Sequence, residues 1–252
     1  MRPADVSDEL FTELKGIARG LGATSFGVAS VDAMLKAGLR CPTPEFERFP
    51  RAISVGFRLS DAVIETLVDR PTKLYAYHYR MVNAQLDRIA LELTGALQER
   101  GYAALPLPSS QVVDWDEQRG QASHKWVALF AGLGFFGLSN LIVHPEFGAR
   151  LRYVTVYTDA PLPTAEPLEA DCGECRACVA ACPCGAIGET REGFDLDRCR
   201  EQLDLFKKTA DVGHHICGLC IKACRGKLGT VPNSQDTRPC NPSEKEETGN
   251  CP

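Results

Sequence analysis

The chain has 252 residues, of which 44% are hydrophobic and 24% are charged, a composition typical of a folded globular protein. Its formal net charge of −5 argues against nucleic-acid binding as the main function, because phosphate contacts favour a basic surface. Twelve cysteines would suggest disulfides in a secreted chain, but the N-terminal MRPADVSDELF has no apolar signal core. We therefore expect a cytoplasmic protein whose cysteines are reduced and bind metal.

Helices and strands alternate in the first part of the chain. Apolar residues recur at helical spacing within residues 10–21, and Gly22 supplies a stop. Strands are predicted at residues 25–30 and 52–59. The clearest helix covers residues 74–100, where one apolar stripe continues over several turns.

The elements that follow are shorter. The sequence predicts a strand at residues 102–107 and, after a loop with Pro and Ser, a helix at residues 122–130. Residues 141–144 and 151–158 are predicted to be paired strands around the turn PEFGA. The mixture indicates a layered α/β or α+β fold.

The cysteines divide the chain into parts. Only Cys41 lies before position 172, and the segment APLPTAEPLEAD is typical of a linker. We expect a cofactor or substrate domain at 1–160, a cysteine-rich domain at 161–228 and a disordered tail at 229–252. The longest apolar stretch is too short for a membrane span, so no membrane partner is expected.

The cysteine spacing carries the chemistry. Four cysteines run C-x2-C-x2-C-x3-C-P from Cys172 to Cys182, and a second set runs C-x2-C-x3-C from Cys217 to Cys224, with Cys199 between the sets. Soft thiolates select iron–sulfur clusters or zinc. The first run is the bacterial ferredoxin pattern, in which the fourth cysteine ligates the other cluster. Zinc needs only four ligands and leaves this run unexplained.

The spacing therefore predicts two 4Fe-4S clusters with crossed ligands. The first cluster is predicted to take Cys172, Cys175, Cys178 and Cys224. The second is predicted to take Cys182, Cys199, Cys217 and Cys220. The alternative is that Cys199 is a structural thiol and one cluster is incomplete. Cys184 is expected to be a small packing residue, and no role is expected for Cys41, Cys240 and Cys251.

Two titratable residues outside the cysteines are candidates for catalysis. His124 could donate a proton near neutral pH, or it could simply line the start of a helix. Asp114 could act as an acid if Trp115 buried it and raised its pKa, but such residues more often form a solvated loop.

Four residues are candidates for cofactor binding. Lys125 could pair with a phosphate or carboxylate, or be a surface lysine. Gly132 and Gly134 allow close approach of a flat cofactor, although glycines in an apolar loop are more often a packing device. Tyr75 could stack on a planar ligand or pack inside the first domain.

These motifs lead to a known group. HKWVALFAGLGFFGLSNLIVHPEFGARLRYVTVYTDAPLP followed by CGECRACVAACPCGAI resembles the core of epoxyqueuosine reductases and, more distantly, of reductive dehalogenases, over residues 75–225. The resemblance implies an α+β protein with a nitroreductase-like α/β N-terminal domain that holds cobalamin. It also implies a C-terminal ferredoxin-like domain that carries two 4Fe-4S clusters with the crossed ligands given above.

The sequence also departs from that family. His124 and Lys125 occupy the places of the Glu and Arg in the motif D-x-x-P-x-x-E-R. Phe135 and Phe136, with Leu138 and Ser139, replace the usual Trp-x-Gly-Lys. The helical-repeat extension with which epoxyqueuosine reductases hold tRNA has no counterpart after Cys224, so we expect that tRNA is not a partner.

Two functions follow from this reading. The first is a reductase in which the clusters deliver electrons to cobalamin or a small-molecule substrate held by the N-terminal domain. The alternative is an electron-transfer protein that takes electrons from a ferredoxin or flavodoxin and passes them to a partner such as a corrinoid protein. The size of the first domain favours the enzyme, because a carrier can be much smaller.

Overall fold

A four-stranded antiparallel sheet forms the centre of the structure, a computed structural model that describes residues 3–39, 46, 48–114 and 120–226. In sheet order the strands are β1 (Ser25–Ser30), β2 (Arg51–Arg58), β6 (Leu151–Thr158) and β3 (Ala104–Leu107). The two central strands, β2 and β6, pair along their whole length. Both are largely buried, as expected for strands with both faces covered.

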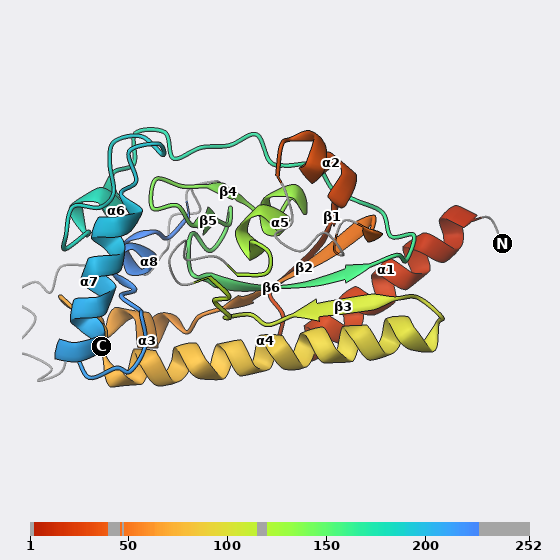
Figure 1. Cartoon of the computed structure of the whole chain (residues 1–252), viewed down its shortest axis with the longest axis horizontal. Helices are drawn as coiled ribbons and strands as arrows, with labels where there is room; N and C mark the ends of the chain where they lie inside the picture. The colour runs from red at the N-terminus through yellow and green to blue at the C-terminus, as the bar shows by residue number, and fades with distance from the viewer. Residues whose placement is uncertain (1–2, 40–45, 47, 115–119, 227–252) are drawn as a thin grey trace, which may run out of the picture.

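Helices cover both faces of this sheet (Figure 1). On one face lie α1 (Pro3–Gly20) and α4 (Lys73–Glu99), and on the other lie α2 (Val31–Lys36) and α5 (His124–Phe130). Neighbouring strand residues enter different cores because successive side chains point to opposite faces. Val154 and Val156 pack with α1 and α4, whereas Tyr153 and Tyr157 pack with α2 and α5.

The cysteine-bearing segments lie at one end of the molecule, away from the N-terminus (Figure 1). They comprise the helices α6 (Ala177–Ala180), α7 (Leu196–Thr209) and α8 (Leu219–Ala223). Three of their residues, Val212, Ile216 and Leu219, belong to the same core as α1 and α4. The two parts of the chain therefore share a core, and the domain boundary at residue 160 stays a prediction.

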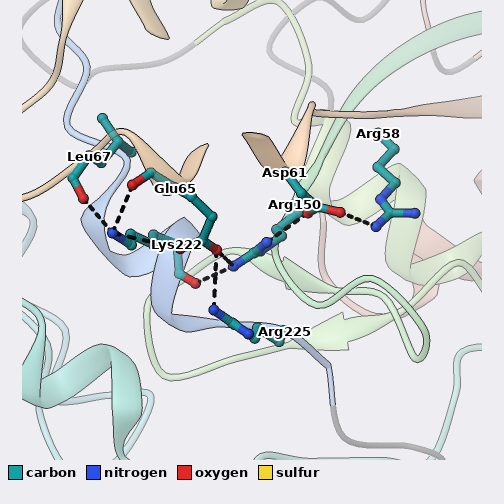
Figure 2. A network of polar contacts seen from close by, with 7 residues as sticks. All are labelled: Arg58, Asp61, Glu65, Leu67, Arg150, Lys222 and Arg225. Atoms are coloured by element: carbon teal, nitrogen blue, oxygen red, sulfur yellow. Dashed lines mark hydrogen bonds and ion pairs between the residues drawn. The ribbon is translucent and has the colours of Figure 1, made fainter. Parts of the chain in front are cut away.

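The buried Arg150 connects α8 to α3 (Asp61–Glu65) by hydrogen bonds and ion pairs, as Figure 2 shows. The guanidinium of Arg150 donates to Asp61 Oδ1 at 2.6 Å, to Glu65 Oε1 at 3.0 Å and to the carbonyl oxygen of Lys222 at 2.7 Å. Lys222 Nζ in turn donates to the carbonyl oxygens of Glu65 and Leu67. The network therefore positions the helix that carries Cys220 and ends before Cys224.

Most of the predicted elements are confirmed. The strand at residues 25–30 has the predicted bounds, and the long helix, capped by the Thr72 hydroxyl, covers Lys73–Glu99. The short helices α2 and α3 were not predicted from the sequence. None of the helices in the described part is long and apolar enough to cross a membrane.

One predicted pairing is wrong. Residues 141–144 do not pair with residues 151–158 as a hairpin, and only an isolated bridge joins His144 to Gly148. Instead, β5 (Ile142–Val143) pairs with β4 (Phe135–Phe136), while β6 pairs with β2 and β3. The reason is that β6 is a central strand whose two edges already pair with β2 and β3.

The predicted tail and Cys41, Cys240 and Cys251 lie outside the described residues.

Candidate metal centre and the adjoining cavity

Nine free cysteines lie in the described part of the chain, and four of them form a first group. Burial raises the pKa of the Cys178 thiol to about 11, and the neighbouring Cys224, Cys172 and Cys175 raise it further. Burial also raises the pKa of Cys224, and Cys172 and Cys175 raise it further. Because such effects weaken with distance, these four thiols are neighbours in the structure.

The other five cysteines form a second group. Burial raises the pKa of Cys199 to about 11, with further contributions from Cys184 and Cys182. Burial likewise raises the pKa of Cys217 to about 11, and the neighbours that add to it are Cys199, Cys182 and Cys184. Burial raises the pKa of Cys220 far above the usual range, and Cys217, Cys199, Cys178 of the first group and Cys182 raise it further. The second group thus has one thiol more than the first.

Cys182 has a distinct environment within this group. Its Sγ lies 3.8 Å from the Sγ of Cys184 and accepts a hydrogen bond from the backbone N–H of Ala186 at 3.3 Å. Burial alone would raise the pKa of Cys182, but backbone N–H donors at Cys184, Ala186 and Ile187 outweigh it and lower the pKa. Its sulfur is therefore the one best prepared to be a thiolate.

The donor set suits iron–sulfur clusters. Sulfur is the soft ligand that such clusters take, and a bound metal deprotonates a coordinating thiol even when burial disfavours the free thiolate. Among the residues that the structure describes, no group of three or more His, Cys, Asp or Glu side chains is arranged to hold a metal ion. The chemistry of the two thiol groups, which supply only sulfur, is what suits them to iron–sulfur clusters.

Glycines bring the cysteine loops close to the N-terminal part. Gly218 has φ +89°, and a Cβ there would lie 2.8 Å from the ring of Tyr75. Gly148 has φ +60°, and a Cβ there would lie 2.2 Å from the carbonyl oxygen of Cys224. A side chain at either position would push a cysteine segment outwards.

A cavity of about 780 Å³ is lined by residues of α5, of β6 and of the loop after β3. Its apolar wall includes Leu107, Ile142 and Tyr157, and its polar wall includes residues from the loop after β3 and from β6. Ile221, which lies on α8 between two cysteines, is part of the same wall. The cavity and the cysteine helix thus have a residue in common.

Lys125 lies between the cavity and the second thiol group. It lines the cavity, and its Nζ donates to the carbonyl oxygen of Asn140 at 3.0 Å. Burial lowers its pKa, the nearby Arg191 lowers it further, and Cys199 acts in the opposite direction. Lys125 is partly buried, and its role in cofactor binding stays a prediction.

The polar wall of the cavity is organised by Arg152. Its guanidinium lies 4.1 Å from the ring centroid of Tyr79, and its Nε donates to Asn83 Oδ1 at 2.5 Å. The hydroxyl groups of Tyr79 and Ser110 lie 2.9 Å apart. Tyr153 also lines the cavity, and its buried hydroxyl has no partner among the described residues. Such an orphaned hydroxyl is available to a ligand.

His124 lines the cavity but has both ring nitrogens occupied. Nδ1 lies 2.8 Å from the hydroxyl of Thr155, and Nε2 lies 2.9 Å from the carbonyl oxygen of Pro108. The carbonyl can only accept, so Nε2 carries the proton and Nδ1 accepts from Thr155. Burial lowers the pKa of His124, which keeps the ring neutral. Its position favours the reading as a residue that lines the helix start, and its catalytic role stays a prediction.

The other predicted site residues do not line the cavity in the described part of the chain. Asp114 is exposed, and Trp115, which was expected to cover it, lies outside the described residues. Tyr75 is 2% exposed in the main core. A Cβ at Gly132 or Gly134 would lie too close to backbone carbonyl oxygens, so close packing of the backbone explains why glycine stands at both positions. Their cofactor roles stay predictions.

Comparison with known proteins supports the predicted resemblance. No family model matches the chain. The epoxyqueuosine reductase of Synechococcus is 28% identical over 63% of this chain and 49% of its own length. That of Escherichia coli is 40% identical over 30% of this chain and 20% of its own length. The chain spans about half the length, or less, of these curated relatives.

Solved structures share the fold. A catabolic reductive dehalogenase superposes with a TM-score of 0.65 and 18% identity, over 84% of this chain and 31% of that chain. An epoxyqueuosine reductase bound to an epoxyqueuosine-modified tRNA stem loop superposes with a TM-score of 0.53 and 20% identity, over 89% of this chain and 68% of that chain. The expected mixture of helices and sheet, with the resemblance to both groups, is confirmed.

Proposed function

We propose that this chain is an iron–sulfur oxidoreductase that uses two 4Fe-4S clusters to deliver electrons to a cofactor or substrate in the cavity. The first cluster would be held by Cys172, Cys175, Cys178 and Cys224. The second would be held by Cys182, Cys199, Cys217 and Cys220. The grouping of the thiols supports this crossed assignment, because the last cysteine of the chain's second set lies with the first run.

The observation that carries the proposal is that two residues of the cavity wall lie close to the second thiol group. Ile221 on α8 lines the cavity, and Lys125 lies close enough to Cys199 for each to act on the other's pKa. An electron donor is useful to an enzyme only where it adjoins the reacting molecule. A simple carrier would have no need of a cavity of this size near its cluster.

Cobalamin is the cofactor that the resemblance implies, and the cavity has features that suit it. The apolar wall offers contact for a flat ring system, while Arg152, Ser110 and the orphaned Tyr153 hydroxyl offer polar contacts. A bound corrinoid would supply the reductive chemistry itself. The residues of this chain would bind and orient it, and His124, with both nitrogens occupied, would line the site without reaching the metal.

The proposed reaction is the reductive removal of a group or an oxygen from a small molecule, with electrons supplied by a ferredoxin or flavodoxin. The alternative function, transfer of electrons to a corrinoid protein without a reaction of its own, would use the same clusters. One structural relative holds a tRNA stem loop, so the expectation that tRNA is not a partner gains no support from the comparison.

Gel filtration of the anaerobically reconstituted protein after incubation with cobalamin tests the proposal. We expect corrinoid absorbance to elute with the iron–sulfur absorbance. Ser110→Trp, at an exposed position that lines the cavity, should abolish corrinoid retention and leave the iron content unchanged. Ser60→Trp, exposed but outside the cavity wall, is the matched control. Iron–sulfur absorbance alone, with reduction of an added corrinoid protein, would favour the alternative.

A further inference from the structure

The second thiol group contains one cysteine more than a cluster can bind. A 4Fe-4S cluster takes four cysteine ligands, one for each iron. The first group has four thiols, but the second has five, namely Cys182, Cys184, Cys199, Cys217 and Cys220. One thiol of the second group must therefore remain outside the cluster at any moment.

The extra thiol lies against the sulfur of one assigned ligand, Cys182. The Sγ of Cys184 lies 3.8 Å from the Sγ of Cys182. A sulfur at this distance from the sulfur of an assigned ligand is placed to replace it.

The backbone around Cys184 explains which thiol is the resident ligand. A tight turn follows Pro183, where the N–H of Gly185, at φ +65°, donates to the carbonyl oxygen of Cys182 at 3.3 Å. The next N–H, that of Ala186, donates to the sulfur of Cys182. Because hydrogen bonds to a ligating sulfur strengthen it as a ligand, Cys182 is the preferred ligand of the cluster. Cys184 lies beside it without a bond to iron.

We infer that Cys184 is a substitute ligand that takes the iron corner of Cys182 when Cys182 is lost or displaced. The inference rests on the proposed function, because it requires the second cluster. In the exchange, the iron–sulfur bond to Cys182 breaks, the bond to Cys184 forms, and the thiol proton of Cys184 passes to the sulfur of Cys182. No electron is gained or lost. The two ligand forms would differ in hydrogen bonding to sulfur, a property that tunes cluster potentials.

Iron analysis of four variants tests this inference without any activity measurement. After anaerobic reconstitution, the wild type and Cys184→Ala should each hold about eight iron atoms per chain, since Cys182 suffices. Cys182→Ala should also hold about eight, whereas Cys182→Ala/Cys184→Ala should fall to about four. The matched control is Cys175→Ala, from the group without a spare thiol, which should fall to about four.

Alkylation gives a second measurement that does not depend on how well Cys182→Ala folds. In the loaded wild type, iodoacetamide should modify Cys184, which is partly exposed. In loaded Cys182→Ser, the same reagent should leave Cys184 unmodified, because its sulfur is bound to iron. If Cys182→Ala loses iron as Cys175→Ala does, or if Cys184 stays reactive in Cys182→Ser, the inference is overturned and the proposed function stands. A wild type without acid-labile sulfide would overturn both.

Discussion

Replacement of Arg150 by Met tests whether the network of Figure 2 holds the cysteine helix in place. The Arg150 side chain is 7% exposed, and its guanidinium bonds to Asp61, Glu65 and the carbonyl oxygen of Lys222. Met has a similar length and fills much of the same space but removes the charge and every donor. The variant therefore separates the polar contacts from the packing.

The expected magnitude follows from the exposure of the partners. The carboxylates of Asp61 and Glu65 are 43% and 41% exposed, so water can replace the lost contacts, and each pair contributes about 0–1 kcal/mol. The hydrogen bond from a charged donor to the Lys222 carbonyl contributes about 1.5–3 kcal/mol. Removal of the buried charge and of the unpartnered Nε of Arg150 offsets part of these lost contributions. The free energy of unfolding should therefore decrease by about 2 kcal/mol.

Thermal unfolding of the reconstituted protein under anaerobic conditions measures this loss. For a chain of this size, about 2 kcal/mol corresponds to a decrease in Tm of about 4–8 °C. The control is Arg58→Met, because Arg58 pairs with the same Asp61 but is 43% exposed and stacks on Phe147, so its removal should cost no more than about 1 kcal/mol. An equal decrease in Tm for both variants would refute the role given to Arg150.

Three further outcomes are expected. Burial lowers the pKa of His124, so the stability that its neutral ring contributes is complete above the ordinary pKa of 6.5 and is lost as the pH falls below that value. The Tm of the wild type should therefore fall between about pH 8 and about pH 5.5, and His124→Asn should make this fall smaller. A fall of the same size in the variant would contradict the argument. Tyr153→Phe removes a buried hydroxyl that has no partner among the described residues, so the Tm should stay equal or rise while corrinoid retention weakens. A lower Tm would show that the hydroxyl has a protein partner. Gly218→Ala would force a Cβ to within 2.8 Å of Tyr75, so iron content should fall by about half on quantification, and full loading would show that the loop can adjust.

Local pattern was enough to predict individual elements but not their partners. The alternation in residues 25–30 and the apolar stripe of residues 74–100 gave β1 and α4 within one residue. The pairing of residues 151–158 with a near neighbour failed, because β6 instead finds β2 about one hundred residues earlier in the chain. Strand pairing over such a separation leaves no signal in the short sequence windows that the predictions used.

The same contrast holds for the site. The spacing of the cysteines predicts the crossed grouping because the motif itself brings Cys182 to the second cluster. The contact between the sulfurs of Cys184 and Cys182 depends on the turn at Gly185 and was not predicted. Arg152, Tyr153 and Ile221 were missed as well, since the cavity unites β6 and α8 from distant parts of the sequence. An arginine and a tyrosine inside an apolar strand were the only signal.

Quantification of metals and acid-labile sulfide in the chain purified without air tests the central claim most directly. Two clusters held by the two thiol groups predict about eight iron atoms and about eight sulfides per chain. About one zinc per chain with no acid-labile sulfide would contradict the claim, because the cysteines would then serve a structural metal and could carry no electrons to the cavity.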